Sequence, residues 1–252
     1  AQLLKNNSAD KITRGTYHAF ANHTLRHYSR MLNLPPNFTI IDTADSEDVV
    51  DLIRQEMGFA KKHQAFPKKS RVQSIISKAR NCNLPIEEIL RREYTALLEF
   101  TADLNLLNQA YQQYKFANKL FDYDDLMDVL RDSLRDNIPF RRIMQNNYRY
   151  LMVDEFQDTN VVQKEILDYI AQGSRNIMVV GDDAQSIYAF RGATIDNILS
   201  FEKDYPDLKI FKLGIFLKKF TKKVLELFVE RSTKYRMSIK GIVERVRRKS
   251  ML

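Results

Sequence analysis

Residues 148–160 read YRYLMVDEFQDTN: a mostly apolar run of strand type that leads directly into carboxylates. Residues 176–185 read NIMVVGDDAQ and repeat this pattern of an apolar run followed by polar side chains. Between them Val162, Ile166 and Ile170 recur at helical spacing. Strands that alternate with helices predict an α/β fold with a parallel sheet. Ligands bind beyond the carboxyl ends of such strands, so we expect both polar segments to face one cleft.

The acidic motif, residues 154–160, offers two interpretations. An Asp directly after a strand can hold Mg²⁺, which prefers oxygen ligands and bridges phosphates. An adjacent Glu can orient or deprotonate a water that attacks a γ-phosphate. The alternative is helix capping: Asp158 or Asn160 would cap the following helix, and Gln163 would complete a capping box with Asn160.

The glutamine motif, residues 181–193, also follows a strand. Gln185 can hydrogen-bond a phosphate or the attacking water, and Tyr188, Phe190 and Arg191 combine aromatic faces with a cation, as in sites that stack single-stranded bases. In the alternative interpretation one aromatic ring belongs to the core and Arg191 pairs with a neighbouring aspartate.

Taken together, the two motifs resemble motifs II and III of superfamily 1 helicases of the UvrD/Rep/PcrA group, with Asp154 preceding Gly181 by 27 residues. Residues 15–20 resemble the family's Thr-Phe-His-Ser block, and residues 121–126 its Asp-Phe-Asp-Asp-Leu block. The resemblance spans roughly residues 10–213. It implies a partial RecA-like ATPase domain (residues 1–25 and 119–213), which has a parallel sheet with flanking helices, and an inserted all-helical subdomain (residues 26–118).

The resemblance also implies roles for single residues. Asp154 is expected to hold Mg²⁺, Glu155 to act as the catalytic base, and Gln185 to sense the γ-phosphate. Phe190 would stack on a base where most relatives have Trp. Tyr188, Arg191, Tyr17 and His18 are weaker candidates for DNA contacts. The implied cofactors are ATP and Mg²⁺, and the implied partners are single-stranded or duplex-junction DNA together with repair or replication proteins. The implied activity is 3′-to-5′ translocation and unwinding.

The chain lacks the phosphate-binding loop Gly-x-x-x-x-Gly-Lys-Ser/Thr, because none of its seven glycines is followed by Lys. In the family that loop lies upstream of the block at residues 15–20, so it would precede Ala1. We therefore expect the chain alone to hydrolyse ATP negligibly. Two alternatives remain open: a non-catalytic DNA- or partner-binding remnant, and part of a helicase–nuclease subunit of the RecB or AddA type.

The charge of +8 arises from the end of the chain. Residues 214–252 hold 12 Lys and Arg against 3 Asp and Glu, whereas residues 1–213 hold 28 against 29. This basic tail does not resemble the family. It represents either a shifted reading frame or an amphipathic helix that binds nucleic acid or membrane. A single cysteine fits a reducing compartment, and no apolar run is long enough to span a membrane, so a cytoplasmic location is the default.

Helical stripes are expected within residues 26–118. Ser46 is expected to cap the helix that carries Val49, Val50, Ile53 and Met57. A second stripe is formed by Val72, Ile75, Ile76 and Ala79, and a third helical segment runs from Leu97 to Tyr114. Further expectations are a strand and helix near residues 12–20, a helix at 123–135, a helix near 195–203 and a strand at 209–213.

Overall fold

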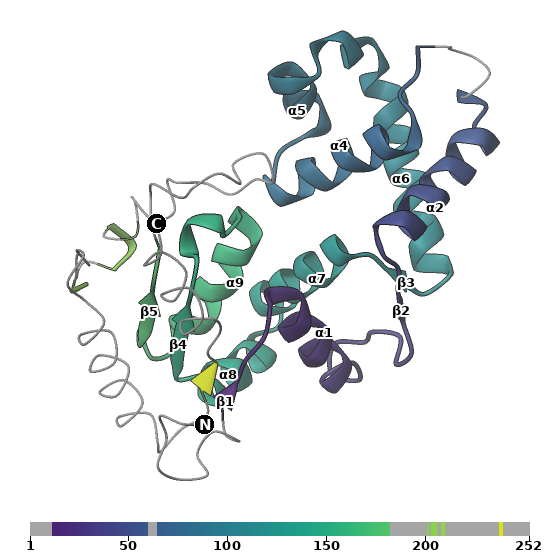
Figure 1. Ribbon diagram of the computed structural model, residues 1–252. Helices are drawn as coiled ribbons and strands as arrows, with labels where there is room; N and C mark the ends of the chain where they lie inside the picture. The colour runs from purple at the N-terminus through teal and green to yellow at the C-terminus, as the bar shows by residue number, and fades with distance from the viewer. Residues whose placement is uncertain are drawn as a thin grey trace, which may run out of the picture.

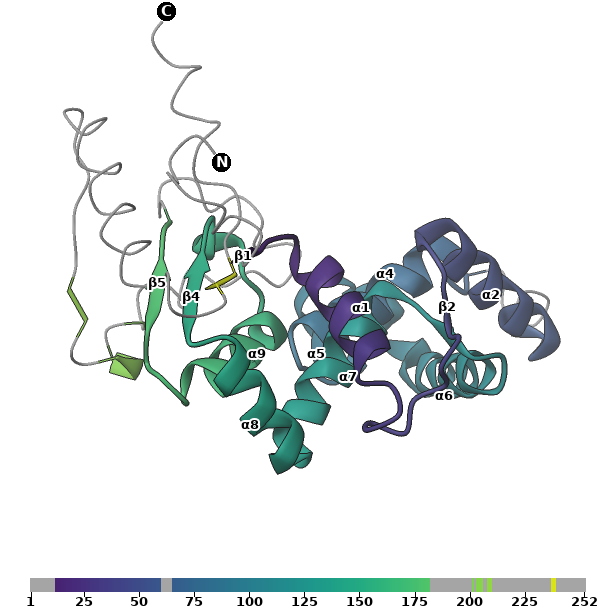
Figure 2. The same cartoon turned by 90° about the horizontal axis from the view of Figure 1, so that it is seen from below.

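The computed structural model describes residues 12–59, 65–181, 201, 203–205, 208–209 and 237–238. Across these residues the fold is mostly helical and contains two small parallel sheets, and the helices form two groups (Figures 1 and 2). The first group, the helical lobe, comprises α2 (Thr43–Glu56), α4 (Lys69–Asn81), α5 (Ile86–Glu93), the 3-10 helix η2 (Thr95–Phe100) and α6 (Thr101–Ala117). The second group, the sheet lobe, comprises β1 (Ile12–Thr13), α1 (Tyr17–His27), α7 (Tyr123–Asp136), α8 (Ile138–Asn147), β4 (Tyr150–Val153), the 3-10 turn η3 (Phe156–Asp158), α9 (Val161–Ala171), β5 (Ile177–Val179) and β6 (Met237–Ser238).

The sheet of the sheet lobe has the strand order β1-β6-β4-β5, and every neighbouring pair is parallel. Leu151 pairs with Ile177 and Val153 pairs with Val179, so β4 and β5 end at the same edge. The second sheet joins β2 (Thr39–Ile40) to β3 (Leu120–Phe121), also in parallel, where the chain enters and leaves the helical lobe. The predicted parallel pairing of the two apolar runs is therefore confirmed.

The sheet lobe packs its helices around one apolar core. Val162, Ile166 and Ile170 of α9 are buried, as their spacing predicted, and α9 packs against α7 and α8. Buried residues of α1 belong to the same core. The helix expected at 123–135 is α7, which begins after the capping residue Asp122. Helix α8 was not predicted. It begins after Asn137, whose side chain accepts a hydrogen bond from the amide of Phe140.

The helical lobe has a separate core, to which α4 contributes the predicted stripe. The prediction for the start of α2 was wrong. The helix begins at Thr43 and is capped by Asp42, whose carboxylate accepts from the amide of Asp45 while the Asp45 side chain bonds back to Asp42. Ser46 lies one turn inside the helix and is only 1% exposed, because it faces the neighbouring helices. Leu97 lies in η2, so the predicted third segment is a 3-10 turn followed by α6.

Several expected elements lie wholly or mostly outside the described residues. Of the helix expected near 195–203, Phe201 and Lys203 are described and are helical. The strand expected at 209–213 lies outside the described part, apart from Lys209. The same holds for the basic tail, apart from β6, which pairs with β1 and β4. Among the helices that are described, none has the length and apolar character needed to cross a membrane.

Candidate functional site at the carboxyl edge of the sheet

The acidic motif begins where β4 ends, beside the end of β5. The amide of Val180 donates to the carbonyl of Val153 at 2.8 Å, and the amide of Phe156 donates to the carbonyl of Val180 at 2.9 Å. These two bonds join the acidic turn to the residue that precedes Gly181. The start of the glutamine motif therefore lies next to Asp154 and Glu155, as the parallel pairing predicted.

The two carboxylates of the acidic motif are held by short-range hydrogen bonds. Asp154 Oδ1 accepts from the amide of Glu155 at 3.0 Å, and Gln157 Nε2 donates to Glu155 Oε2 at 2.7 Å. Gln157 is 1% exposed, so the donor is fixed by packing. Glu155 has a left-handed backbone with φ of 53°, which costs a non-glycine residue on the order of 1 kcal/mol. The surrounding contacts maintain this conformation and fix the direction in which the carboxylate leaves the sheet.

The end of the acidic motif caps a helix, as the alternative interpretation predicted. Asn160 Oδ1 accepts from the amide of Gln163 at 2.8 Å, and Gln163 Oε1 accepts from the amide of Asn160 at 3.2 Å. This capping box starts α9. Asn160 supplies this cap, so neither Asp154 nor Glu155 is needed for it. The capping interpretation is confirmed for Asn160, and the roles of Asp154 and Glu155 stay predictions.

Tyr17 and His18 begin α1, which is capped by Thr16. The Tyr17 hydroxyl lies 3.4 Å from Thr159 Oγ1, and burial raises the pKa of Tyr17, so the phenol keeps its proton at neutral pH. The His18 ring meets the edge of the Tyr123 ring at 5.5 Å. The structure thus brings Tyr17 against the acidic motif, whereas His18 lies beside a half-exposed aromatic ring. Their DNA contacts stay predictions.

The other predicted site residues, Gln185, Tyr188, Phe190 and Arg191, lie outside the described residues. The part of the chain that is described holds no cluster of three or more His, Cys, Asp or Glu suited to a metal ion.

Sequence reasoning gave no role to Gln157, Thr159 or Asn81. Gln157 contacts Glu155, and Thr159 contacts Tyr17. Both lie within the acidic motif, so their position could have suggested that they support the predicted site residues. Asn81 gives no such signal, because it lies 79 residues before Asn160, with which it forms a hydrogen bond.

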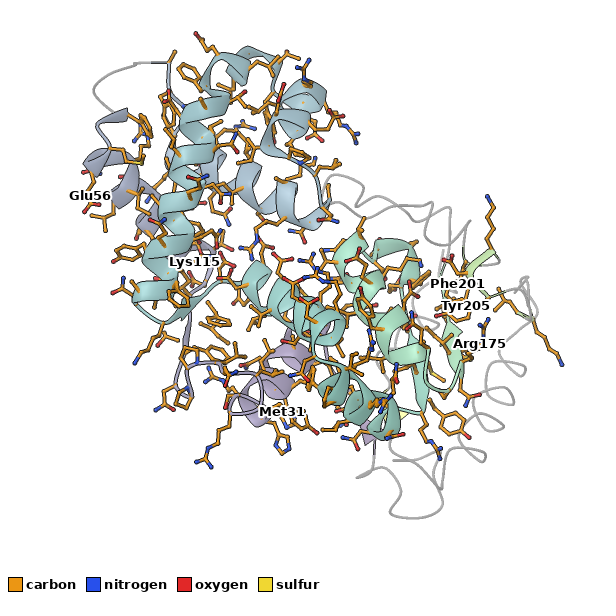
Figure 3. The ribbon with its side chains drawn as sticks, turned by 180° about the vertical axis from the view of Figure 1, so that it is seen from behind. Met31, Glu56, Lys115, Arg175, Phe201 and Tyr205 are labelled. Carbon is orange, nitrogen blue, oxygen red and sulfur yellow. The ribbon has the colours of Figure 1, made fainter. Side chains whose placement is uncertain are left out.

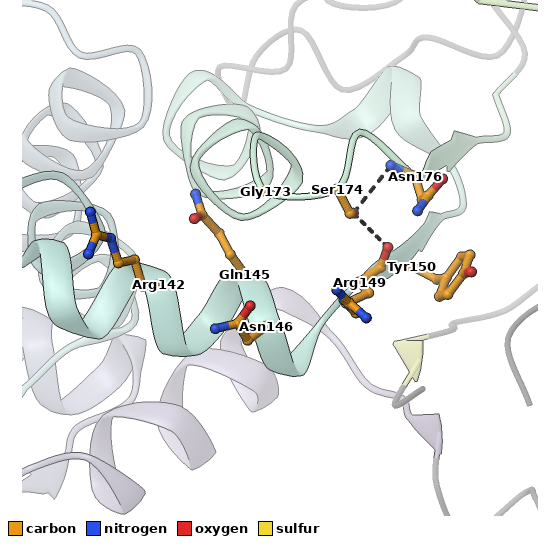
Figure 4. Close-up of a pocket in the computed structure, with 8 residues that line it drawn as sticks. All are labelled: Arg142, Gln145, Asn146, Arg149, Tyr150, Gly173, Ser174 and Asn176. Carbon is orange, nitrogen blue, oxygen red and sulfur yellow. Dashed lines mark hydrogen bonds between the residues drawn. The ribbon is translucent and has the colours of Figure 1, made fainter. Parts of the chain in front are cut away.

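A surface pocket of about 520 Å³ lies at the opposite edge of the sheet (Figure 4). Its lining includes Arg149 and Tyr150 at the start of β4 and Ser174 and Asn176 before β5. Ser174 Oγ donates to the carbonyl of Arg149 at 2.6 Å and closes this end of the sheet. The pocket is separated from Asp154 by the length of β4, so it is not part of the candidate nucleotide site.

Comparison with known proteins identifies the family. The UvrD/REP helicase N-terminal domain matches residues 1–206. The chain is 35% identical over 207 residues to the ATP-dependent DNA helicase PcrA of Leuconostoc citreum, an alignment that covers 82% of this chain and 27% of that protein. It is 35% identical over 209 residues to PcrA of Bacillus subtilis (81% and 27%) and 33% identical over 209 residues to PcrA of Staphylococcus aureus strain Mu50 (82% and 27%). The chain therefore spans about a quarter of the length of these relatives. The chain belongs to the UvrD/REP helicase family and corresponds to its N-terminal domain.

Proposed function

We propose that this chain forms the part of an ATP-dependent DNA helicase that acts on the γ-phosphate of ATP, within a partial RecA-like domain. The observation that supports this most strongly is the acidic turn at the shared carboxyl edge of β4 and β5, where the start of the glutamine motif lies beside Glu155. An edge of this kind is where parallel α/β sheets bind nucleotides.

Each carboxylate has a distinct proposed role. Asp154 holds Mg²⁺, directly or through water, and the ion neutralises charge on the phosphates when it is bound. Glu155 orients the attacking water and accepts its proton. The hydrogen bond from Gln157 supports this role, because it fixes the orientation of the Glu155 carboxylate.

Gln185 is proposed to sense the γ-phosphate and to pass the nucleotide state to the DNA-binding residues. Phe190 stacks on a base, with Tyr188, Arg191 and His18 as further contacts. Tyr17 is a further candidate for a DNA contact, and its hydroxyl contacts the acidic motif at Thr159. The DNA is single-stranded or at a duplex junction, and the whole protein moves along it from 3′ to 5′.

A chimera tests the catalytic assignment. The segment of this chain that matches the Bacillus subtilis relative replaces its counterpart there, and DNA-stimulated ATP hydrolysis is measured. We expect Glu155→Gln to lower the turnover about 100-fold or more, since a general base contributes at least that much. Glu165→Gln on α9 is the matched control and should leave the rate unchanged. A Glu155→Gln chimera with full turnover contradicts the assignment.

The isolated chain should hydrolyse ATP negligibly, because it contains no Gly-Lys phosphate loop to hold the substrate. It should still bind a labelled oligo-dT, as measured by fluorescence anisotropy. Phe190→Ala should weaken that binding about tenfold, because stacking on one base contributes about 1–3 kcal/mol. DNA-stimulated turnover near that of the relatives would contradict the first expectation. A chain that binds DNA, combined with an inactive chimera, favours a non-catalytic DNA-binding remnant.

A further inference from the structure

A largely buried cluster of charges joins the two lobes. Arg80, in the last turn of α4, donates from Nε to Asp128 Oδ2 and from Nη2 to Asp125 Oδ1, each at 2.7 Å. Lys115 of α6 forms ion pairs with Asp122 and with Asp125. Figure 3 shows Lys115 where α6 approaches the sheet lobe. Two cations of the helical lobe thus hold three carboxylates at the start of α7, which fixes the end of α4 against the sheet lobe.

Asn81, the residue after Arg80, extends this contact to α9. Its Nδ2 donates to Asp124 Oδ1 at 2.9 Å, and its Oδ1 accepts from Asn160 Nδ2 at 2.6 Å. Asn160 in turn uses its own Oδ1 to cap α9 at Gln163. A second partner sets the orientation of each asparagine side chain. The Asp124 carboxylate accepts, so it faces the NH₂ group of Asn81. The backbone N–H of Gln163 donates, so it faces the side-chain oxygen of Asn160.

A short rigid turn separates Asn160 from the candidate catalytic residue. The amide of Asp158 donates to the carbonyl of Glu155 at 2.9 Å, and the amide of Thr159 donates to the carbonyl of Phe156 at 3.1 Å. These bonds form η3, in which Phe156 and Gln157 are buried. A displacement of Asn160 is therefore transmitted to Glu155 through a turn that has little freedom to absorb it.

We propose that Asn81 is a positioning residue through which the helical lobe holds the acidic turn, so that a movement of α4 changes the placement of Glu155. The functional meaning rests on the proposed role of Glu155 in ATP hydrolysis. The connection from Asn81 to the acidic turn does not depend on that role, because it consists of hydrogen bonds within this chain. By linkage, a change at the acidic turn is transmitted to the end of α4 to the same extent.

The test is Asn160→Asp, which is nearly isosteric. The aspartate keeps an oxygen to cap α9, and a carboxylate is at least as good a cap as an amide, but it loses the donor to Asn81. Amide hydrogen exchange of residues 155–160 in the intact chain is followed by mass spectrometry. We expect exchange there to become about three- to tenfold faster, the change that the loss of one hydrogen bond produces.

Asn137→Asp is the matched control, because Asn137 caps α8 in the same manner within the same lobe. It should leave exchange at residues 155–160 unchanged. Asn81→Ala should reproduce the effect of Asn160→Asp from the other side of the contact.

Unchanged exchange at residues 155–160 in both Asn160→Asp and Asn81→Ala would overturn the proposal. Acceleration that is uniform over the whole chain would also overturn it, since that pattern indicates general loosening. If Asn81→Ala does not fold, Asn160→Asp still decides the question. No nucleotide is needed, so a negative result here leaves the chimera test of the proposed function intact.

Discussion

Replacing Asp122 with asparagine tests the buried charge cluster between the lobes. Asp122 Oδ1 caps α7 by accepting from the amide of Asp125 at 2.7 Å, whereas Oδ2 receives Lys115 and the hydroxyl of Tyr111. An asparagine at this position would keep the capping oxygen and place an NH₂ group against these two donors. Lys115 is 2% exposed and would lose one of its two carboxylates.

The size of the effect follows from two arguments. Burial opposes ionisation of Asp122, but Arg80 and Lys115 outweigh it and lower its pKa from 3.8 to about 2, which corresponds to about 2 kcal/mol at about 1.4 kcal/mol per unit. Breaking a buried ion pair by removing one partner costs about 3–5 kcal/mol. Because Lys115 and Arg80 both keep Asp125, we expect Asp122→Asn to lower the free energy of unfolding by about 3 kcal/mol at pH 7.

The pH dependence has a defined sign. A carboxylate whose pKa is depressed on folding stabilises the protein above its unfolded pKa of about 4, and this contribution is lost as the pH falls towards 2. The difference between the parent chain and Asp122→Asn should therefore be constant from pH 7 to about 5 and shrink below about 4. Urea unfolding followed by circular dichroism at several pH values measures both features.

Asp42→Asn provides the control. Asp42 caps α2 through the same capping box, but it is exposed and lies outside the charge cluster, so the same substitution should change stability little. An Asp122→Asn deficit below about 1 kcal/mol, or one that persists unchanged at pH 3, would refute the reasoning.

Three further predictions concern single side chains. Tyr111→Phe should lower the free energy of unfolding by about 1.5–3 kcal/mol in urea titrations, because the buried hydroxyl donates to the Asp122 carboxylate at 2.9 Å; an unchanged midpoint would contradict this. Burial raises the pKa of the Cys82 thiol, so its reaction with a disulfide reagent at pH 8 should be slower in the folded chain than in urea, and equal rates would show that the thiol is accessible. Gly173→Ala should lower the melting temperature, because the added methyl would lie 2.6 Å from Gln145 Cβ; a melting temperature equal to that of the parent chain would show that α8 moves aside without cost.

The sequence by itself determined the candidate site. The apolar runs of β4 and β5, the carboxylates that follow β4, and the Asn160–Gln163 capping box are all local patterns. Local patterns are readable because strand formation, turn formation and capping depend on residues a few positions apart. The parallel arrangement of strands and helices then required both motifs to begin at one edge.

Only the tertiary structure decided how the two lobes meet. Arg80 and Lys115 form a largely buried cluster with the aspartates at the start of α7. The cluster exists because α4 packs against α7 and because Lys115 of α6 reaches the same carboxylates, and their spacing along the chain does not show this. The mistaken cap at Ser46 has the same cause. Asp42 and Ser46 are both suitable capping residues, and the burial of Ser46 depends on helices distant in sequence. The link from Asn81 to Asn160 spans 79 residues, and a hydrogen bond between such partners exists only after the chain has folded.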